Sequence, residues 1–148
     1  MHIMTPKPEP DLLACRGCLC LASRRASRTI TRAFDRRLRP YGIRATQFSI
    51  LVMLMERGPT TVGELAEALG IERTTLTRNL GVVEHQGWVK IGVGDTDGRS
   101  RVVTATPKGR KAVSAALPAW RRAQAAATAA VGQSGFAALH ALAETALR

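Results

Sequence analysis

A chain of 148 residues, 45% of them hydrophobic, is long enough for one packed domain with appended helices. Aromatic residues make up only 4%, so the core must be built from Leu, Val, Ile, Met and Ala. Lysine and arginine number 22 against 11 acids, a formal net charge of +11, and 18 of the 22 are arginines. This excess favours a polyanionic partner, nucleic acid rather than an anionic membrane surface, although a GC-rich genome would also favour Arg over Lys.

Membrane and secreted classes are disfavoured. The longest apolar run, residues 48–55, is far shorter than the roughly 20 residues of a membrane span. The N-terminus has no basic stretch followed by an apolar one, so we expect no secretory signal, no membrane partner and a cytoplasmic location. Three cysteines are an odd number, which argues against a disulfide scaffold.

The first third of the chain predicts two helices after a disordered tail at residues 1–11, where prolines are frequent. Between Leu12 and Arg39, apolar residues recur at steps of three and four, which predicts a long amphipathic helix. Thr46 is expected to cap a second helix over residues 47–57, which Gly58 ends.

Two further helices follow. Thr61 and Glu64 have the spacing of a capping box and predict a short helix over 62–69, ended by Gly70. The next helix, about 73–86, places its apolar residues on one face and ends before Gly87. Those apolar residues are Leu76, Leu80 and Val83.

The residue periodicity then changes from helical to β. Residues 88–93 and 101–105 are short and rich in β-branched residues, and the loop 94–100 between them predicts a hairpin. Thr106 at the N-cap and Pro107 at the first position restart helix. We expect a kink at Pro118, a break at 131–135 and a final helix over 134–147. The helix after Pro107 has a coiled-coil-like seam of Val113, Leu117, Trp120, Gln124, Ala127 and Val131, which we expect to pack against a second protomer.

This order of elements predicts a mainly α fold with a small β-hairpin wing, a winged helix-turn-helix. The helix over 73–86 would be held by its apolar face and would project a polar one. Threonine hydroxyls donate to phosphates and their methyl groups contact thymine, while arginine and asparagine read guanine and adenine edges. Arginines at the hairpin loop would reach the minor groove or its phosphates. The candidate DNA-binding residues are therefore Arg73, Thr74, Thr75, Thr77, Arg78, Asn79, Arg99 and Arg101.

Two motifs, "ELAEALGIERTTLTRNL" and "GDTDGRSRVVTATPKG", resemble the MarR family of bacterial transcriptional regulators. The resemblance covers residues 12–147. It implies a homodimer formed by residues 12–45 and 107–148, with 46–106 as the DNA-binding domain. It also implies a palindromic double-stranded operator, repression, and release by a small-molecule effector or by oxidation. Asp97 would orient the wing arginines. Two departures are Glu72 in place of a capping Ser, and Gly98 in place of the first wing Arg, for which Arg101 would compensate.

A run of arginines and a group of cysteines leave alternatives open. Nine arginines lie between residues 16 and 44, with Asp35 as the only acid; they form either a solvated helix face or a skirt, centred on Arg24, Arg28 and Arg32, that lengthens the DNA footprint. Cys15, Cys18 and Cys20 are either small residues on a buried stripe or a redox or metalloid trigger, since positive surroundings favour the reactive thiolate. On a helix, Cys15 and Cys18 would share one face.

No sequence motif points to catalysis, a cofactor or a metal. Nucleophile-elbow, phosphate-loop and zinc-helix patterns are missing, and the three histidines are scattered, so we expect no enzyme and no cofactor. The alternative to a regulator is an architectural protein that binds nucleic acid without sequence preference or effector. Sequence preference distinguishes the two, because a regulator prefers its operator over random duplex by roughly 10³-fold or more.

Overall fold

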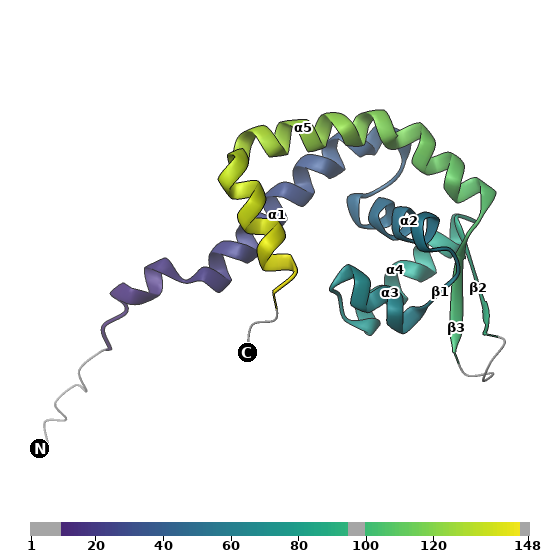
Figure 1. Cartoon of the computed structure of the whole chain (residues 1–148), viewed down its shortest axis with the longest axis horizontal. Helices are drawn as coiled ribbons and strands as arrows, with labels where there is room; N and C mark the ends of the chain where they lie inside the picture. Colours follow the sequence, from purple (N-terminus) through teal and green to yellow (C-terminus); the bar gives the residue numbers. More distant parts are fainter. Residues whose placement is uncertain (1–9, 95–99, 146–148) are drawn as a thin grey trace, which may run out of the picture.

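The computed structural model describes residues 10–94 and 100–145 and contains helices with one small sheet (Figure 1). Two helices, α1 and α5, lie side by side and are set apart from a group formed by the other helices and the sheet. The elements are α1 (Leu19–Leu38), α2 (Ala45–Arg57), β1 (Thr60–Thr61), α3 (Val62–Leu69), α4 (Arg73–His85), β2 (Val89–Val93), β3 (Arg101–Ala105) and α5 (Pro107–Ala143). The expected mainly α winged helix-turn-helix is confirmed.

Local capping signals determine most helix boundaries. The Glu64 N–H donates to Thr61 Oγ1 at 3.2 Å and the Thr61 N–H donates to Glu64 Oε2 at 3.1 Å, which completes the predicted capping box. Gly70, between α3 and α4, has a φ of 65°, which only glycine adopts without strain, so the tight turn depends on it. At the start of α5, Thr106 Oγ1 accepts from the Gly109 N–H at 3.1 Å and donates to the Gly87 carbonyl at 2.6 Å.

The predicted start of the second helix was wrong by two residues. Helix α2 begins at Ala45, and Arg44 rather than Thr46 occupies the N-cap position. The Ala45 N–H donates to Asp35 Oδ1 on α1 at 2.8 Å, and the Arg44 N–H donates to Gln47 Oε1 at 2.9 Å. The carboxylate of Asp35, ten residues earlier in the chain, accepts the free N–H of the first helical turn. A capping side chain at the residue just before the helix is therefore not needed.

The N-terminal segment is also less regular than predicted. Leu13–Gly17 forms a 3-10 turn, and Cys18, with φ −57° and ψ 111°, interrupts the helical backbone before α1 begins at Leu19. Cys15 and Cys18 therefore do not share a helix face, which corrects the expectation from sequence. Of the expected tail, residues 1–9 lie outside the described residues.

The sheet has three strands where the sequence predicted a two-stranded hairpin. All pairs are antiparallel, in the order β1-β3-β2, and Thr60 pairs with Val103 while Val89 pairs with Ala105. A strand of two residues has no alternating pattern of its own. It pairs because the end of α2 brings it beside β3, which the sequence pattern does not record.

Three apolar residues of α4 anchor it to the core. Leu76, Leu80 and Val83 are each at most 2% exposed. They pack in one cluster with residues of α2 and β3, including Leu51, Leu54 and Val103. Burial of one such side chain contributes about 1.5–3 kcal/mol, so this contact determines which face of α4 remains outside.

Helix α5 packs on its own chain over most of the predicted seam. Val113 is buried, and the Trp120 ring is stacked on Phe48 of α2 and tilted against Phe34 of α1. Trp120 is therefore half-buried within its own chain, and contact of the seam with a second protomer stays a prediction. The helical backbone continues through Pro118, and the sharp turn of α5 falls at Gly132, where φ is 70° and ψ is 176°. None of the helices in the described part of the chain is long and apolar enough to cross a membrane.

Candidate nucleic-acid interface

The outer face of α4 presents most of the residues that the sequence singled out. Arg73, Thr74, Thr75, Thr77 and Arg78 are all exposed. Thr74 and Arg78 lie on the side of the helix opposite Leu76, Leu80 and Val83, which are buried. Thr75 and Thr77 lie at the flanks of this outer face. Because the core holds the inner face, the threonine hydroxyls and the guanidinium groups are positioned by a rigid element rather than by a loop.

Arg73 differs from its neighbours because its guanidinium group lies over α3. A Cβ added to Gly63 would lie 2.5 Å from an Nη atom of Arg73, so only glycine leaves room for this placement. Arg73 and Thr77 line a hollow of about 700 Å³ between α3, α4 and the sheet. The hollow also contains Thr61, Val62, Gly63, Leu80, Ile91, Ser100 and Arg101.

Gly63 and Val62 also belong to this surface, which the sequence pattern does not indicate. A glycine inside a short helix is a weak signal of close approach, but nothing in the sequence shows that Arg73 is the group that approaches. Arg101 is exposed on β3 and lines the same hollow, so the structure brings it to the same surface as α4. Asp97 and Arg99 lie outside the described residues.

Asn79 is the α4 candidate that is not fully exposed, and Glu72 is an exposed acid that precedes the helix. Asn79 is half-buried, so its amide is partly covered by the fold. Glu72 occupies the N-cap of α4 and its side chain accepts no capping hydrogen bond. Backbone N–H groups at this helix end therefore keep their positive partial charge, which favours an anion nearby.

The three cysteine thiols are exposed, and none is joined in a disulfide. Cys18 Sγ accepts from the Leu21 N–H at 3.5 Å and so sits at the first turn of α1. The exposure rules out burial of Cys15, Cys18 or Cys20 within their own chain. Among the described residues, no group of three or more His, Cys, Asp or Glu side chains is placed to hold a metal ion.

The chain order is α2, α3, a tight turn, α4 and then the strands β2 and β3 of a three-stranded sheet. This order defines a winged helix-turn-helix protein, and α4, the second helix of the motif, faces outward. Residues 41–100 match the MarR family. The chain is 43% identical to the transcriptional regulator MosR of M. tuberculosis, solved in complex with DNA. That match covers 86% of this chain and 96% of MosR, with a TM-score of 0.74. The chain therefore belongs to the MarR family of transcriptional regulators.

Two further relatives agree with this family. The uncharacterized HTH-type transcriptional regulator YwoH of Bacillus subtilis (strain 168) is 33% identical over 70 residues, which are 47% of this chain and 51% of YwoH. The chain thus matches only about half the length of this curated relative. The structure of reduced AbfR bound to DNA is 27% identical with a TM-score of 0.66, and covers 74% of this chain and 80% of AbfR.

Proposed function

We propose that the chain binds a palindromic double-stranded DNA operator as a homodimer and represses transcription from it. The observation that carries the proposal is the exposed row of threonines and arginines on α4, opposite a face that is fully buried. A helix with this polar face fits the major groove, where such side chains contact phosphates and base edges. The relative MosR was solved on DNA with a similar fold.

Homodimerisation is supported by apolar side chains left exposed at the ends of the chain. These are Leu12, Leu13, Leu19 and Leu21 before and in α1, and Leu139 and Leu142 in α5, all between 42% and 72% exposed. Exposed apolar surface of this extent is unfavourable in water, and a second copy is the partner that would cover both sets at once. Because DNA is the partner, we place the protein in the cytoplasm.

The proposal includes two routes of release. The first is a small-molecule effector in two neighbouring hollows, of about 240 and 170 Å³, that share Ile30, Phe34 and Gln124. Their mostly apolar lining between α1 and α5 suits an apolar or aromatic molecule. The second is oxidation of the exposed thiols near the start of α1. The relative AbfR was solved bound to DNA in both a reduced and an overoxidized form.

Selection of bound duplexes from a random pool tests the function directly. A dimeric regulator should enrich one inverted repeat whose half-sites lie about one helical turn, roughly 10 base pairs, apart. Enrichment of no sequence, together with tight binding to every duplex, would show an architectural protein instead. A variant in which Thr74 and Thr75 are replaced by Ala serves as the matched control, because the fold is expected to persist while the enrichment is lost.

A further inference from the structure

The corner between α1 and α2 forms a second cationic site, separate from the outer face of α4. Four arginines surround a hollow of about 460 Å³ there, three from the end of α1 and the turn after it, and one from the loop before α2. They are Arg32, Arg36, Arg39 and Arg44, and Asp35, Gly42 and Ile43 complete the lining. All four arginine side chains are exposed, while Ile43, at 2% exposed, belongs to the core at the same corner.

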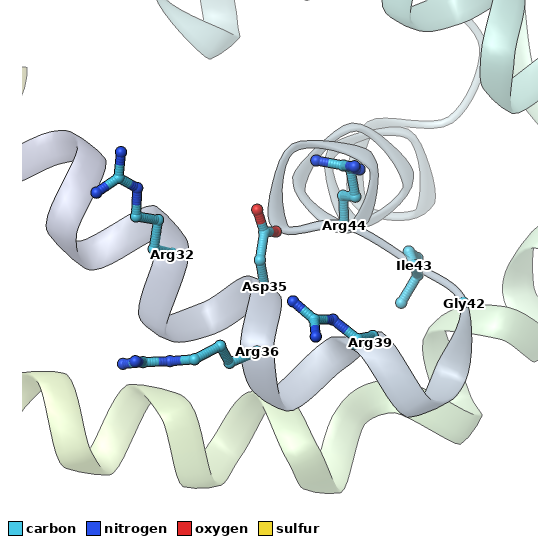
Figure 2. A pocket seen from close by; sticks show the side chains of 7 residues that line it. All are labelled: Arg32, Asp35, Arg36, Arg39, Gly42, Ile43 and Arg44. Carbon is cyan, nitrogen blue, oxygen red and sulfur yellow. The ribbon is translucent and has the colours of Figure 1, made fainter.

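The arrangement in Figure 2 shows how two elements contribute to one site. Arg32, Arg36 and Arg39 follow one another at steps of four and three at the end of α1 and in the turn after it, so their backbone positions share one side of the helix. In Figure 2 the Arg39 side chain extends toward Asp35, whereas the Arg36 side chain extends away from Arg39 and Arg44. Arg44 lies across the gap, at the start of α2. Asp35 lies between Arg32 and Arg44, and its carboxylate points toward the start of α2.

The positive charge of this corner is not neutralised by its own chain. Within residues 10–94 and 100–145, none of the four guanidinium groups pairs with a carboxylate. Asp35 is the one acid in the lining, and its Oδ1 already accepts from the Ala45 N–H at the start of α2, at 2.8 Å. Four arginines against one aspartate leave a formal charge of +3 around the hollow.

We propose that this corner, the arginine corner, binds a phosphate group. Guanidinium groups are planar, hold their charge at any physiological pH and donate two parallel N–H bonds to a phosphate, which explains a set made only of arginine. A phosphate dianion that accepts hydrogen bonds from several guanidinium groups is bound more strongly than a single carboxylate would be. The phosphate is supplied either by a small phosphorylated molecule or by the DNA backbone, and the chemistry of recognition is the same.

A phosphate held in the arginine corner would connect the α1–α5 layer to the winged domain. Arg32 lies in α1 and Arg39 in the short turn that follows it, whereas Arg44 precedes the first helix of the winged domain. Apart from core packing, the Asp35–Ala45 hydrogen bond joins α1 to α2. A ligand that contacts both α1 and the start of α2 binds best at one angle between the α1–α5 layer and the winged domain. A ligand has a regulatory effect only if it binds one such arrangement more tightly than another.

The test uses the full-length protein and three double variants. Arg32→Gln with Arg39→Gln removes two charges from the arginine corner. Arg121→Gln with Arg122→Gln removes the same charge from exposed positions of α5 outside it. Arg32→Lys with Arg39→Lys keeps the charge and removes the paired donors. Circular dichroism and thermal unfolding first establish that each variant is folded.

Inorganic phosphate is titrated by calorimetry at constant ionic strength, and random-sequence duplex is titrated at several salt concentrations. If a free phosphate is the ligand, wild type and the α5 control bind phosphate saturably, the Gln variant binds at least tenfold more weakly, and the Lys variant lies between. If the DNA backbone is the source, phosphate does not saturate, but the salt slope for duplex is smaller by about one to two in the Gln variant alone. Unchanged phosphate binding and an unchanged slope, or equal losses in the α5 control, would overturn the proposal. The phosphate titration does not depend on DNA binding, so it stands even if the proposed function fails.

Discussion

The Trp120 ring of α5 lies stacked on the Phe48 ring of α2, with centroids 5.9 Å apart and an angle of 12° between the planes. Phe34 of α1 packs against the same indole at 6.4 Å. One side chain therefore contacts both α1 and the first helix of the winged domain. This makes Trp120 a structural link between the two regions of the chain.

We expect Trp120→Ala to lower the free energy of unfolding by about 2–3 kcal/mol, somewhat less than the roughly 3–5 kcal/mol typical of a fully buried aromatic residue. The loss follows from the two ring contacts and the half-buried indole. Urea unfolding measures it. Val93→Ala, at a position that is 68% exposed, is the control and should change stability by less than about 0.5 kcal/mol. A Trp120→Ala protein as stable as wild type, but monomeric, would support an interface role instead.

Arg78→Ala should weaken binding to the selected duplex by about 1–3 kcal/mol and relax the preference at one base position per half-site. Arg78 is exposed on the outer face of α4, where a guanidinium group reaches a guanine edge. Fluorescence anisotropy with substituted duplexes measures both effects. The control, Arg110→Ala, removes an equal charge from the exposed start of α5. An equal loss of affinity for selected and random duplexes would make Arg78 a phosphate contact instead of a base-reading residue.

Mild peroxide should reduce operator binding by the wild-type protein and leave a triple variant, Cys15→Ser, Cys18→Ser and Cys20→Ser, unaffected. All three thiols are exposed beside apolar residues proposed for the dimer interface, so their oxidation or cross-linking would displace the segment before α1. Binding before and after peroxide, and after added reductant, measures the effect. Loss of binding in both proteins alike would assign the response to another residue or to general damage.

Stability should fall in acid partly through Glu64. The Thr61 N–H, and then the Thr61 hydroxyl, hold the pKa of this carboxyl below its ordinary value of 4.5 in the folded protein. Its contribution is therefore complete above that value and is lost as the pH falls through the lowered pKa of the folded state. Urea unfolding from about pH 7 to about pH 3 should show that Glu64→Gln is less stable than wild type near neutrality and converges with it in acid. Glu67→Gln, an exposed change on the same helix, should leave the wild-type profile unchanged.

Local signals along the chain were sufficient for most elements of this fold. The capping box at Thr61, the left-handed glycines such as Gly70, and the apolar spacing of Leu76, Leu80 and Val83 each act within a few residues, so the sequence alone predicted α3, α4 and the outward face of α4. The same reasoning predicted the start of α5 from Thr106 and Pro107. Family membership followed from the same stretches, because they contain both the turn and the wing.

Only the tertiary structure decided features that depend on residues distant in sequence. Helix α2 starts at Ala45 because Asp35 on another helix accepts its N–H, and β1 exists because β3 lies beside it. Trp120 lies inside the chain because Phe34 and Phe48 converge on it. The arginines of the N-terminal segment were predicted as a stripe, yet Arg32 and Arg39 meet Arg44 across a corner of the chain. Periodicity reports which residues share a face of one helix, whereas hydrogen bonds and packing between helices determine what that face meets.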